Sequence, residues 1–200
     1  ARTGQVDIRL CGHGDVVPGL IDEAAALIRG EFGKYIYGTD GESIAKVVVD
    51  RLIDLGETVA VAESCTGGFL GHHITAIPGA SAVFVGGIIS YSNELKHKLL
   101  DVKNDTLEKH GAVSKAVALE MAEGARAATG ADHTLSVTGI AGPGGGSTEK
   151  PVGTVWLGLA SAGERPLAVK KHHPYNRETF QQASVNQSLE LLRRRIQRYR

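Results

Sequence analysis

Two polar stretches of the chain carry residue types suited to nucleophilic chemistry. The first is Ala62-Glu-Ser-Cys-Thr-Gly-Gly68, in which Ser64 is a candidate nucleophile. A serine hydroxyl is inert at neutral pH without a base, and the sequence has no obvious His–Asp pair in a suitable place. The second stretch offers Lys96, which can act as the base if burial lowers its pKa enough to leave the amine neutral. Tyr91 could relay a proton or orient this lysine.

Alternatives stay open for each of these residues. Cys65 could replace Ser64 as the nucleophile, because a thiolate at the start of a helix is reactive, although cysteine also behaves as a small buried hydrophobe. Ser64 could merely cap a helix, with Lys96 a solvated surface lysine. Glu63 could be a metal ligand or an acid, but a carboxylate beside a helix N-terminus is also electrostatically stable there.

The elements around Ser64 explain why this stretch could form a site. Residues 58–62 are small or β-branched and predict a short buried strand, and an apolar helical pattern starts at Phe69. A strand that turns sharply into a helix leaves the first N–H groups of the helix unpaired. The donors would be those of Cys65, Thr66, Gly67 and Gly68, and they could bind an anion or stabilise an oxyanion.

A third segment, the glycine-rich loop from Thr138 to Pro151, also follows a predicted strand. It lacks the phosphate-loop spacing of Gly-x-x-x-x-Gly-Lys-Ser/Thr. Gly139, its other glycines and Lys150 could cradle a substrate, or the loop could be a flexible surface turn. Because ligands gather at the carboxyl ends of strands in open α/β sheets, one pocket built from all three segments is the simplest interpretation.

The rest of the chain alternates helices with apolar strands, which predicts an α/β fold: a mixed, largely parallel sheet covered by helices on both faces. Thr39 and Glu42 have the spacing of a capping box, which opens a helix that ends at Gly56. Ser114 caps a helix that ends at Gly130. Further strands are expected at 83–90, 133–138, 152–160 and 167–172, the last two as a hairpin, and a final helix around 180–196.

The first residues form a separate unit. Residues 4–10 alternate as a half-exposed strand, residues 15–32 have helical periodicity, and residues 35–37 could form a second strand. A strand–helix–strand of this size is too small to fold alone. We therefore expect the remnant of a preceding domain at 1–38 and one larger domain at 39–200.

Composition narrows the function classes. Lysine plus arginine equals aspartate plus glutamate at 22 each, so the formal charge is zero and nothing favours binding to nucleic acid or an anionic membrane. The two cysteines are typical of reduced thiols in a cytosol. No apolar run is long enough to span a bilayer and no signal peptide is visible, so we expect a cytoplasmic protein. Neither adjacent histidine pair has the spacing of metal ligands, and we expect no metal.

Five motifs in the same order resemble the C-terminal domain of the CinA (competence/damage-inducible protein A) family, over roughly Gly38 to the end. They are Ala62-Glu-Ser-Cys-Thr-Gly-Gly68, Tyr91-Ser-Asn-Glu-Leu-Lys96, Gly111-Ala-Val-Ser114, Thr138-Gly-Ile-Ala-Gly-Pro143 and Lys150-Pro-Val-Gly-Thr-Val155. Residues 1–38 resemble the tail of the KH-like connecting segment of longer members, so we expect this chain to lack their molybdopterin-binding-like N-terminal domain.

The resemblance implies a nicotinamide-nucleotide amidase that needs no cofactor. By similarity, Ser64 is the nucleophile and Lys96 its base, with Tyr91 assisting, while Thr138 and Arg177 position nicotinamide mononucleotide. The expected assembly is a homo-oligomer, with a dimer favoured. The sequence departs from the family pattern at Gly144, where an acidic residue is frequent, and at Tyr175-Asn-Arg177, which replaces the usual Gly-Asp-Arg. The alternative hypothesis is a non-catalytic interaction module linked to competence or the DNA damage response.

Overall fold

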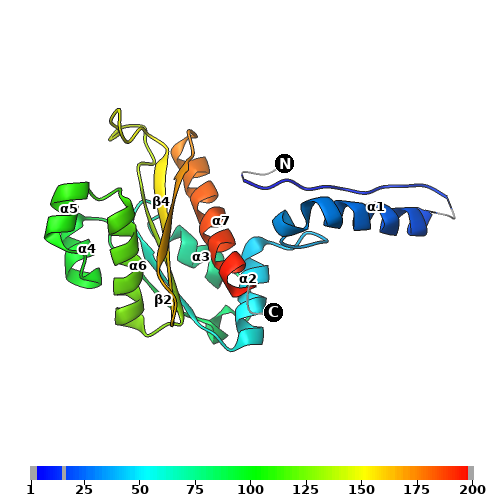
Figure 1. Ribbon diagram of the computed structural model, residues 1–200, viewed down its shortest axis with the longest axis horizontal. Coiled ribbons are helices and arrows are strands. Elements are labelled where there is room, and N and C mark those ends of the chain that lie inside the picture. The colour runs from blue at the N-terminus through cyan, green and yellow to red at the C-terminus, as the bar shows by residue number, and fades with distance from the viewer. Residues whose placement is uncertain (1–3, 15–16, 198–200) are drawn as a thin grey trace.

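A five-stranded mixed sheet forms the centre of the protein (Figure 1). The computed structural model describes residues 4–14 and 17–197. The strands are β1 (Val59–Glu63), β2 (Phe84–Ile89), β3 (His133–Gly139), β4 (Thr154–Ser161) and β5 (Leu167–His172). Their order is β2-β1-β3-β4-β5, with parallel pairing of β1 to β2 and β3, and antiparallel pairing along β3-β4-β5. The predicted α/β fold with a mixed sheet is confirmed.

Helices cover both faces of this sheet (Figure 1). On one face lie α2 (Ile44–Leu55), α3 (Phe69–Thr75) and α7 (Arg177–Ile196), and on the other lie α4 (Asn93–Leu100), α5 (Asn104–His110) and α6 (Lys115–Thr129). Each face has its own apolar cluster, one containing Val61, Leu135 and Leu189 and the other Ala62 and Met121. Val61 and Ala62 are neighbours in β1 and point to opposite faces, as the pleat of a strand requires.

The start of α2 differs from the prediction. Thr39 N–H does donate to the Glu42 carboxylate at 3.2 Å, but the helix begins only at Ile44, and Ser43 is its N-cap. The reason lies in the backbone: Asp40 and Gly41 have φ of 52° and 85°, which a right-handed helix cannot contain. The Thr39–Glu42 bond therefore closes a turn that precedes the helix. The predicted end of α2 at Gly56, in the left-handed region, is confirmed.

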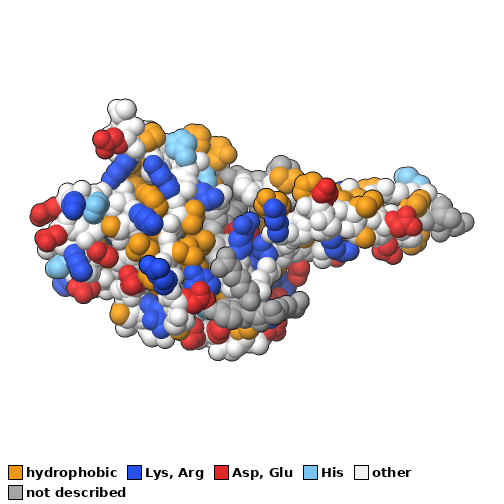
Figure 2. All heavy atoms as spheres, in the orientation of Figure 1, with side chains coloured by type: hydrophobic (Ala, Val, Ile, Leu, Met, Phe, Trp, Pro, Cys, Tyr) orange, Lys and Arg blue, Asp and Glu red, His pale blue; other side chains and the backbone are white. Residues whose placement is uncertain are grey.

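The N-terminal segment projects from the body of the protein (Figure 1). Helix α1 (Val17–Phe32) forms where the periodicity predicted it, but none of its residues is buried, and hydrophobic side chains lie on the surface of the projection (Figure 2). The two predicted strands are wrong: residues 4–10 contain only an isolated bridge at Gln5, and Gly33–Tyr35 is a 3-10 turn, η1. Alternating residues form a strand only where a neighbouring strand completes the ladder. The predicted domain boundary at residue 38 stays a prediction.

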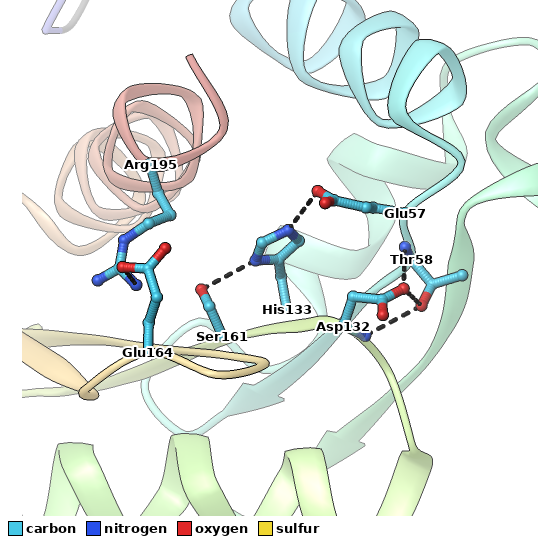
Figure 3. Close-up of polar contacts among 7 residues, drawn as sticks. All are labelled: Glu57, Thr58, Asp132, His133, Ser161, Glu164 and Arg195. Carbon is cyan, nitrogen blue, oxygen red and sulfur yellow. Dashed lines mark hydrogen bonds and ion pairs between the residues drawn. The ribbon is translucent and has the colours of Figure 1, made fainter. Parts of the chain in front are cut away.

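The amino ends of β1 and β3 carry a polar cluster (Figure 3). The His133 ring contacts Ser161 Oγ through Nδ1 at 2.9 Å and the Glu57 carboxylate through Nε2 at 2.8 Å. Asp132 accepts hydrogen bonds from the N–H and the hydroxyl of Thr58. These contacts join the end of α2, the starts of β1 and β3, and the end of β4. They lie at the end of the sheet opposite to the residues discussed next.

Candidate active site

Ser64 lies at the sharp turn between β1 and α3. Its N–H donates to the carbonyl of Val137 on the neighbouring strand β3, so the turn starts from a fixed point at the sheet. The turn then passes through Gly67 and Gly68, whose φ angles of 60° and 102° lie in the left-handed region that glycine adopts most readily. Ser64 is 8% exposed and borders a pocket. The serine hydroxyl therefore sits on a rigid corner with one open side.

Lys96 reaches Ser64 from the first turn of α4. Its side chain is 1% exposed, and its Nζ lies 3.0 Å from Ser64 Oγ, 2.8 Å from the carbonyl oxygen of Ser90 and 3.2 Å from that of Tyr91. Burial lowers the pKa of Lys96, because a charged amine loses hydration there. The amine lies within donating distance of both carbonyl oxygens and of Ser64 Oγ. In its neutral form, with two N–H groups and one lone pair, donation to the two carbonyls would direct the lone pair at the serine hydroxyl.

The structure separates the two candidate nucleophiles. Cys65 is buried, and desolvation raises the pKa of its thiol to about 12. The thiol is therefore protonated throughout the neutral range, and a protonated thiol is a poor nucleophile. Ser64, beside an amine whose pKa is lowered by burial, is the better candidate. This distinction depends on burial, which the sequence left open.

Glu63 has a structural role at the start of α3. Its buried carboxylate accepts hydrogen bonds from the N–H groups of Gly68, Leu70 and Gly71, at 2.8–3.0 Å. Gly67 N–H is also engaged, with the carbonyl oxygen of Ser64 at 3.1 Å. Two of the four N–H donors expected from the sequence are thus occupied. Among the described residues, the N–H groups of Cys65 and Thr66 donate no hydrogen bond to another backbone group.

The three polar segments of the sequence meet in one pocket of ≈210 Å³. The predicted residues that line it are Ser64, Cys65, Tyr91, Lys96, Thr138, Gly139 and Arg177. Thr66, Gly67 and Gly68 are in the adjoining turn and do not line it. Ala112 and Val113, which do, were not predicted as site residues; their only signal was the Gly-Ala-Val-Ser motif before α6.

Tyr91 and Arg177 form the mouth of the pocket. The Arg177 guanidinium donates to the Tyr91 hydroxyl at 3.0 Å and to the carbonyl of Gly142 at 3.2 Å. Tyr91 therefore contacts Lys96 through its backbone carbonyl, whereas its phenol hydroxyl contacts Arg177. Arg177 is the first residue of α7, and Asn176 caps that helix by accepting from Thr179 N–H. The departure from Gly-Asp-Arg thus keeps a good capping residue before the arginine.

Thr138 and Gly139 form the opposite wall. The Thr138 hydroxyl donates to the carbonyl of Ala112 at 2.8 Å, which joins β3 to the segment before α6. A Cβ on Gly139 would lie 2.9 Å from both the Phe180 ring and the carbonyl oxygen of Thr154, so only glycine fits. The glycine-rich loop beyond is held by Lys150, whose amine donates to the carbonyl of His110 at 2.6 Å.

Gln181 is a neighbour of the site that the sequence analysis missed. It lies in α7, and its side-chain amide donates to the carbonyl oxygen of Cys65 at 2.8 Å across 116 positions of sequence. Nothing in the helical periodicity of α7 distinguishes it from the other polar residues of that helix.

In the part of the chain that the structure describes, no three His, Cys, Asp or Glu side chains gather as metal ligands. No described helix is long and apolar enough to cross a bilayer.

The fold and the site define an α/β domain with a buried serine–lysine pair where parallel strands end. The model of the CinA C-terminal domain family matches residues 41–196. The chain belongs to this family. Among its relatives, a CinA-like protein of Parasynechococcus marenigrum is 46% identical over 200 residues, covering 98% of this chain and 48% of the relative. A CinA-like protein of Thermotoga sp. (strain RQ2) is 44% identical over 174 residues, covering 87% and 42%.

Solved structures agree with this assignment. The competence/damage inducible protein CihA of Agrobacterium tumefaciens has a TM-score of 0.71 and 39% identity, over 78% of this chain and 97% of that one. A CinA superfamily protein of Klebsiella pneumoniae has a TM-score of 0.75 and 31% identity, with the same coverage of 78% and 97%. This chain spans about half the length of the curated relatives that it matches. None of these names states a reaction.

Proposed function

We propose that the domain is an amidohydrolase that converts nicotinamide mononucleotide to nicotinic acid mononucleotide and ammonia through a Ser64–Lys96 dyad. The observation that carries the proposal is the environment of the Lys96 amine: 3.0 Å from Ser64 Oγ, 1% exposed, with two backbone carbonyls to accept its N–H groups. Burial lowers the pKa of this amine, and a neutral amine can act as the base that activates a neighbouring serine.

In the first half of the reaction, Lys96 Nζ takes the proton of Ser64, and Oγ attacks the carboxamide carbon. The carbonyl oxygen becomes an oxyanion, which the unengaged N–H groups of Cys65 and Thr66 can stabilise. The carbon–nitrogen bond then breaks, and the nitrogen takes the proton from the Lys96 ammonium and leaves as ammonia. Ser64 is left as an acyl ester of the pyridine carboxylate.

In the second half, a water molecule replaces ammonia in the pocket. Lys96 takes a proton from this water, and the resulting hydroxide attacks the ester carbon. The carbon–Oγ bond breaks, Ser64 recovers its proton from Lys96, and the product leaves as a carboxylate. One amine thus serves as base and acid in both halves, which is supported by the 3.0 Å distance from Lys96 Nζ to Ser64 Oγ at the wall of the pocket that both residues line.

Arg177 supports a phosphorylated substrate. Of the five N–H donors of its guanidinium, one is directed at Tyr91 and one at Gly142, so donors remain at the mouth for a phosphate. The planar fork of arginine suits that group. The small pocket would then hold the pyridine ring with its carboxamide, and the phosphate would lie outside this pocket. The choice of nicotinamide mononucleotide itself rests on the family resemblance.

The test is ammonia release from nicotinamide mononucleotide, with and without a chelator. Ser64→Ala and Lys96→Met should each lower kcat by roughly a thousandfold or more. The matched controls are Ser81→Ala and Lys98→Met, which remove exposed residues of the same types, and both should keep wild-type activity. Equal turnover by Ser64→Ala would reject the dyad. No turnover by the wild type would favour the non-catalytic interaction module, and loss of activity in chelator would reject a metal-free mechanism.

Three further parts of the proposal concern the whole protein. We propose that it assembles as a homodimer, has no affinity for nucleic acid and acts in the cytoplasm. The balanced charge supports the second part, since phosphate-backbone binding needs an excess of lysine and arginine. Sedimentation equilibrium of the purified protein, alone and with a DNA duplex at low salt, tests the first two parts together.

A further inference from the structure

The turn that carries Ser64 is held by a side chain from the far end of the chain. Gln181 in α7 places its amide 2.8 Å from the carbonyl oxygen of Cys65. Since a carbonyl oxygen only accepts, the group that faces it must be the NH₂ of the glutamine, so the orientation of the amide is fixed by chemistry. The Cys65 carbonyl belongs to the same peptide unit as Thr66 N–H.

The geometry of the peptide unit relates this contact to the direction of Thr66 N–H. In a planar trans peptide, the C=O and N–H bonds point in opposite directions. A hydrogen bond that holds the Cys65 carbonyl toward α7 therefore turns Thr66 N–H away from α7. The preceding peptide is held in the same manner, because the Ser64 carbonyl accepts from Gly67 N–H at 3.1 Å and Cys65 N–H must point the other way.

The two N–H groups directed by these bonds are the ones that remain unengaged among the described residues of this turn. The bond to Gly67 is local and belongs to the turn itself. The bond to Gln181 is not local, and without it the Cys65–Thr66 peptide could rotate as a unit within the turn.

We propose that Gln181 is a positioning residue that orients the Cys65–Thr66 peptide so that Thr66 N–H stabilises the oxyanion formed at Ser64. This inference rests on the proposed function. Gln181 lies four positions after Arg177 on α7, so both side chains project from the same face of that helix. One helical turn thus supplies the pocket's arginine and the support of the nucleophile turn.

The experiment compares three substitutions in α7. Gln181→Met has a similar length but no donor, and Gln181→Glu puts a carboxylate where the NH₂ was, which repels the Cys65 carbonyl and attracts Thr66 N–H. Gln182→Met is the matched control, because Gln182 contacts His73 and Asn186 and not the turn. We expect kcat to fall about tenfold in Gln181→Met and about a hundredfold in Gln181→Glu, with KM within roughly threefold and Gln182→Met unchanged.

A second readout does not need the natural substrate. Phenylmethanesulfonyl fluoride transfers its sulfonyl group to an activated serine: the Oγ–S bond forms, fluoride leaves and the serine proton goes to the base. The rate of sulfonylation of Ser64 is followed by intact mass, with Ser64→Ala as the blank. It should be highest in the wild type, lower in Gln181→Met and lowest in Gln181→Glu. Labelling of Ser64 without ammonia release would reject the substrate while keeping the role of Gln181 testable.

The outcomes separate positioning from packing. Equal kcat in wild type and Gln181→Glu, or equal losses in Gln181→Met and Gln182→Met, would overturn the proposal. So would a loss confined to KM, or a loss that follows the urea midpoint of each variant, since both indicate a merely structural role. An unlabelled Ser64 in the wild type would also overturn it, because the turn would then hold no activated serine.

Discussion

At the scale of single residues, the site depends on what burial does to two ionisable groups that are close together. The same dry environment lowers the pKa of Lys96 and raises the pKa of Cys65 to about 12. Burial favours the uncharged form of both groups. In the proposed mechanism the neutral lysine acts as the base, while the protonated thiol is a poor nucleophile. Ser64 needs no shift of its own, since it loses its proton only as it attacks.

The pH dependence of ammonia release should report the lowered pKa of Lys96. Only the neutral amine can take a proton, so kcat/KM should rise with pH through that pKa and be lost below it. We expect the inflection below the ordinary lysine value of about 10.4. Between the two values, the unfolded chain binds a proton that the folded chain does not, so stability should also rise with pH. Steady-state rates of ammonia release from pH 5 to 10 measure the inflection of kcat/KM. An inflection at the ordinary lysine value would contradict the assignment of Lys96 as the base.

Cysteine labelling should distinguish the two thiols of the chain. Cys65 is buried and Cys11 is exposed, so iodoacetamide at pH 8 should modify Cys11 in the native protein and leave Cys65 untouched. Both should react in concentrated urea, which serves as the control for reagent and detection. Peptide mass spectrometry locates the label. Comparable native rates at the two positions would contradict the buried, protonated thiol.

At the scale of helices and strands, the sequence predicts best what local chemistry determines. Ser114 caps α6 as predicted, and Gly56 and Gly130 end α2 and α6 in the left-handed region. Helix α5 was not predicted, because its seven mostly polar residues show no apolar period. The strand predicted at residues 4–10 failed for the opposite reason: it has the period, but the described residues give it no partner strand beyond an isolated bridge at Gln5.

The same distinction, between what local sequence determines and what packing determines, applies to the residues of the site. Ser64, Lys96 and the glycine loop follow strands, and strand ends are visible in the sequence, so their convergence was predictable. The place of Glu63 at the N-terminus of α3 agrees with the structural alternative that the sequence offered for it. The contact of Gln181 with Cys65 was not predictable, because it is a single side-chain contact made possible by packing, and no periodic pattern encodes which polar residue of α7 meets the turn.

Two helical glycines provide an element-scale test of how closely α6 packs on α4. A Cβ on Gly124 in α6 would lie 1.8 Å from the carbonyl oxygen of Leu100, the last residue of α4, whereas a Cβ on Gly30 in α1 meets nothing within 4 Å. Gly124→Ala should therefore lower the free energy of unfolding by about 2 kcal/mol or more. Gly30→Ala should not lower it, and should raise helicity. Urea unfolding followed by circular dichroism measures both, and equal midpoints would contradict the packing.

At the scale of the whole molecule, the proposed catalytic residues and a stabilising polar cluster lie at opposite ends of the sheet. The serine–lysine pair lies where β1 and β2 end, and the His133 cluster lies where β1 and β3 begin (Figure 3). The cluster has the residue types of a hydrolase triad, yet Ser161 is buried and does not line the pocket of Ser64 and Lys96. Its serine is therefore a structural hydrogen-bonding partner, since a nucleophile must be reachable by a substrate.

This separation predicts that the His133 cluster affects stability and not catalysis. His133→Phe keeps the ring shape but removes both hydrogen bonds, which leaves Ser161 and Glu57 without their partner. The free energy of unfolding should fall by about 1–3 kcal/mol, while kcat and KM of the folded protein stay at wild-type values. His13→Phe, at an exposed position of the N-terminal segment, should change neither quantity. Because Phe cannot donate or accept, an unchanged urea midpoint would mean that the cluster contributes no net stability, and a selective loss of kcat would mean that the two ends of the sheet are coupled.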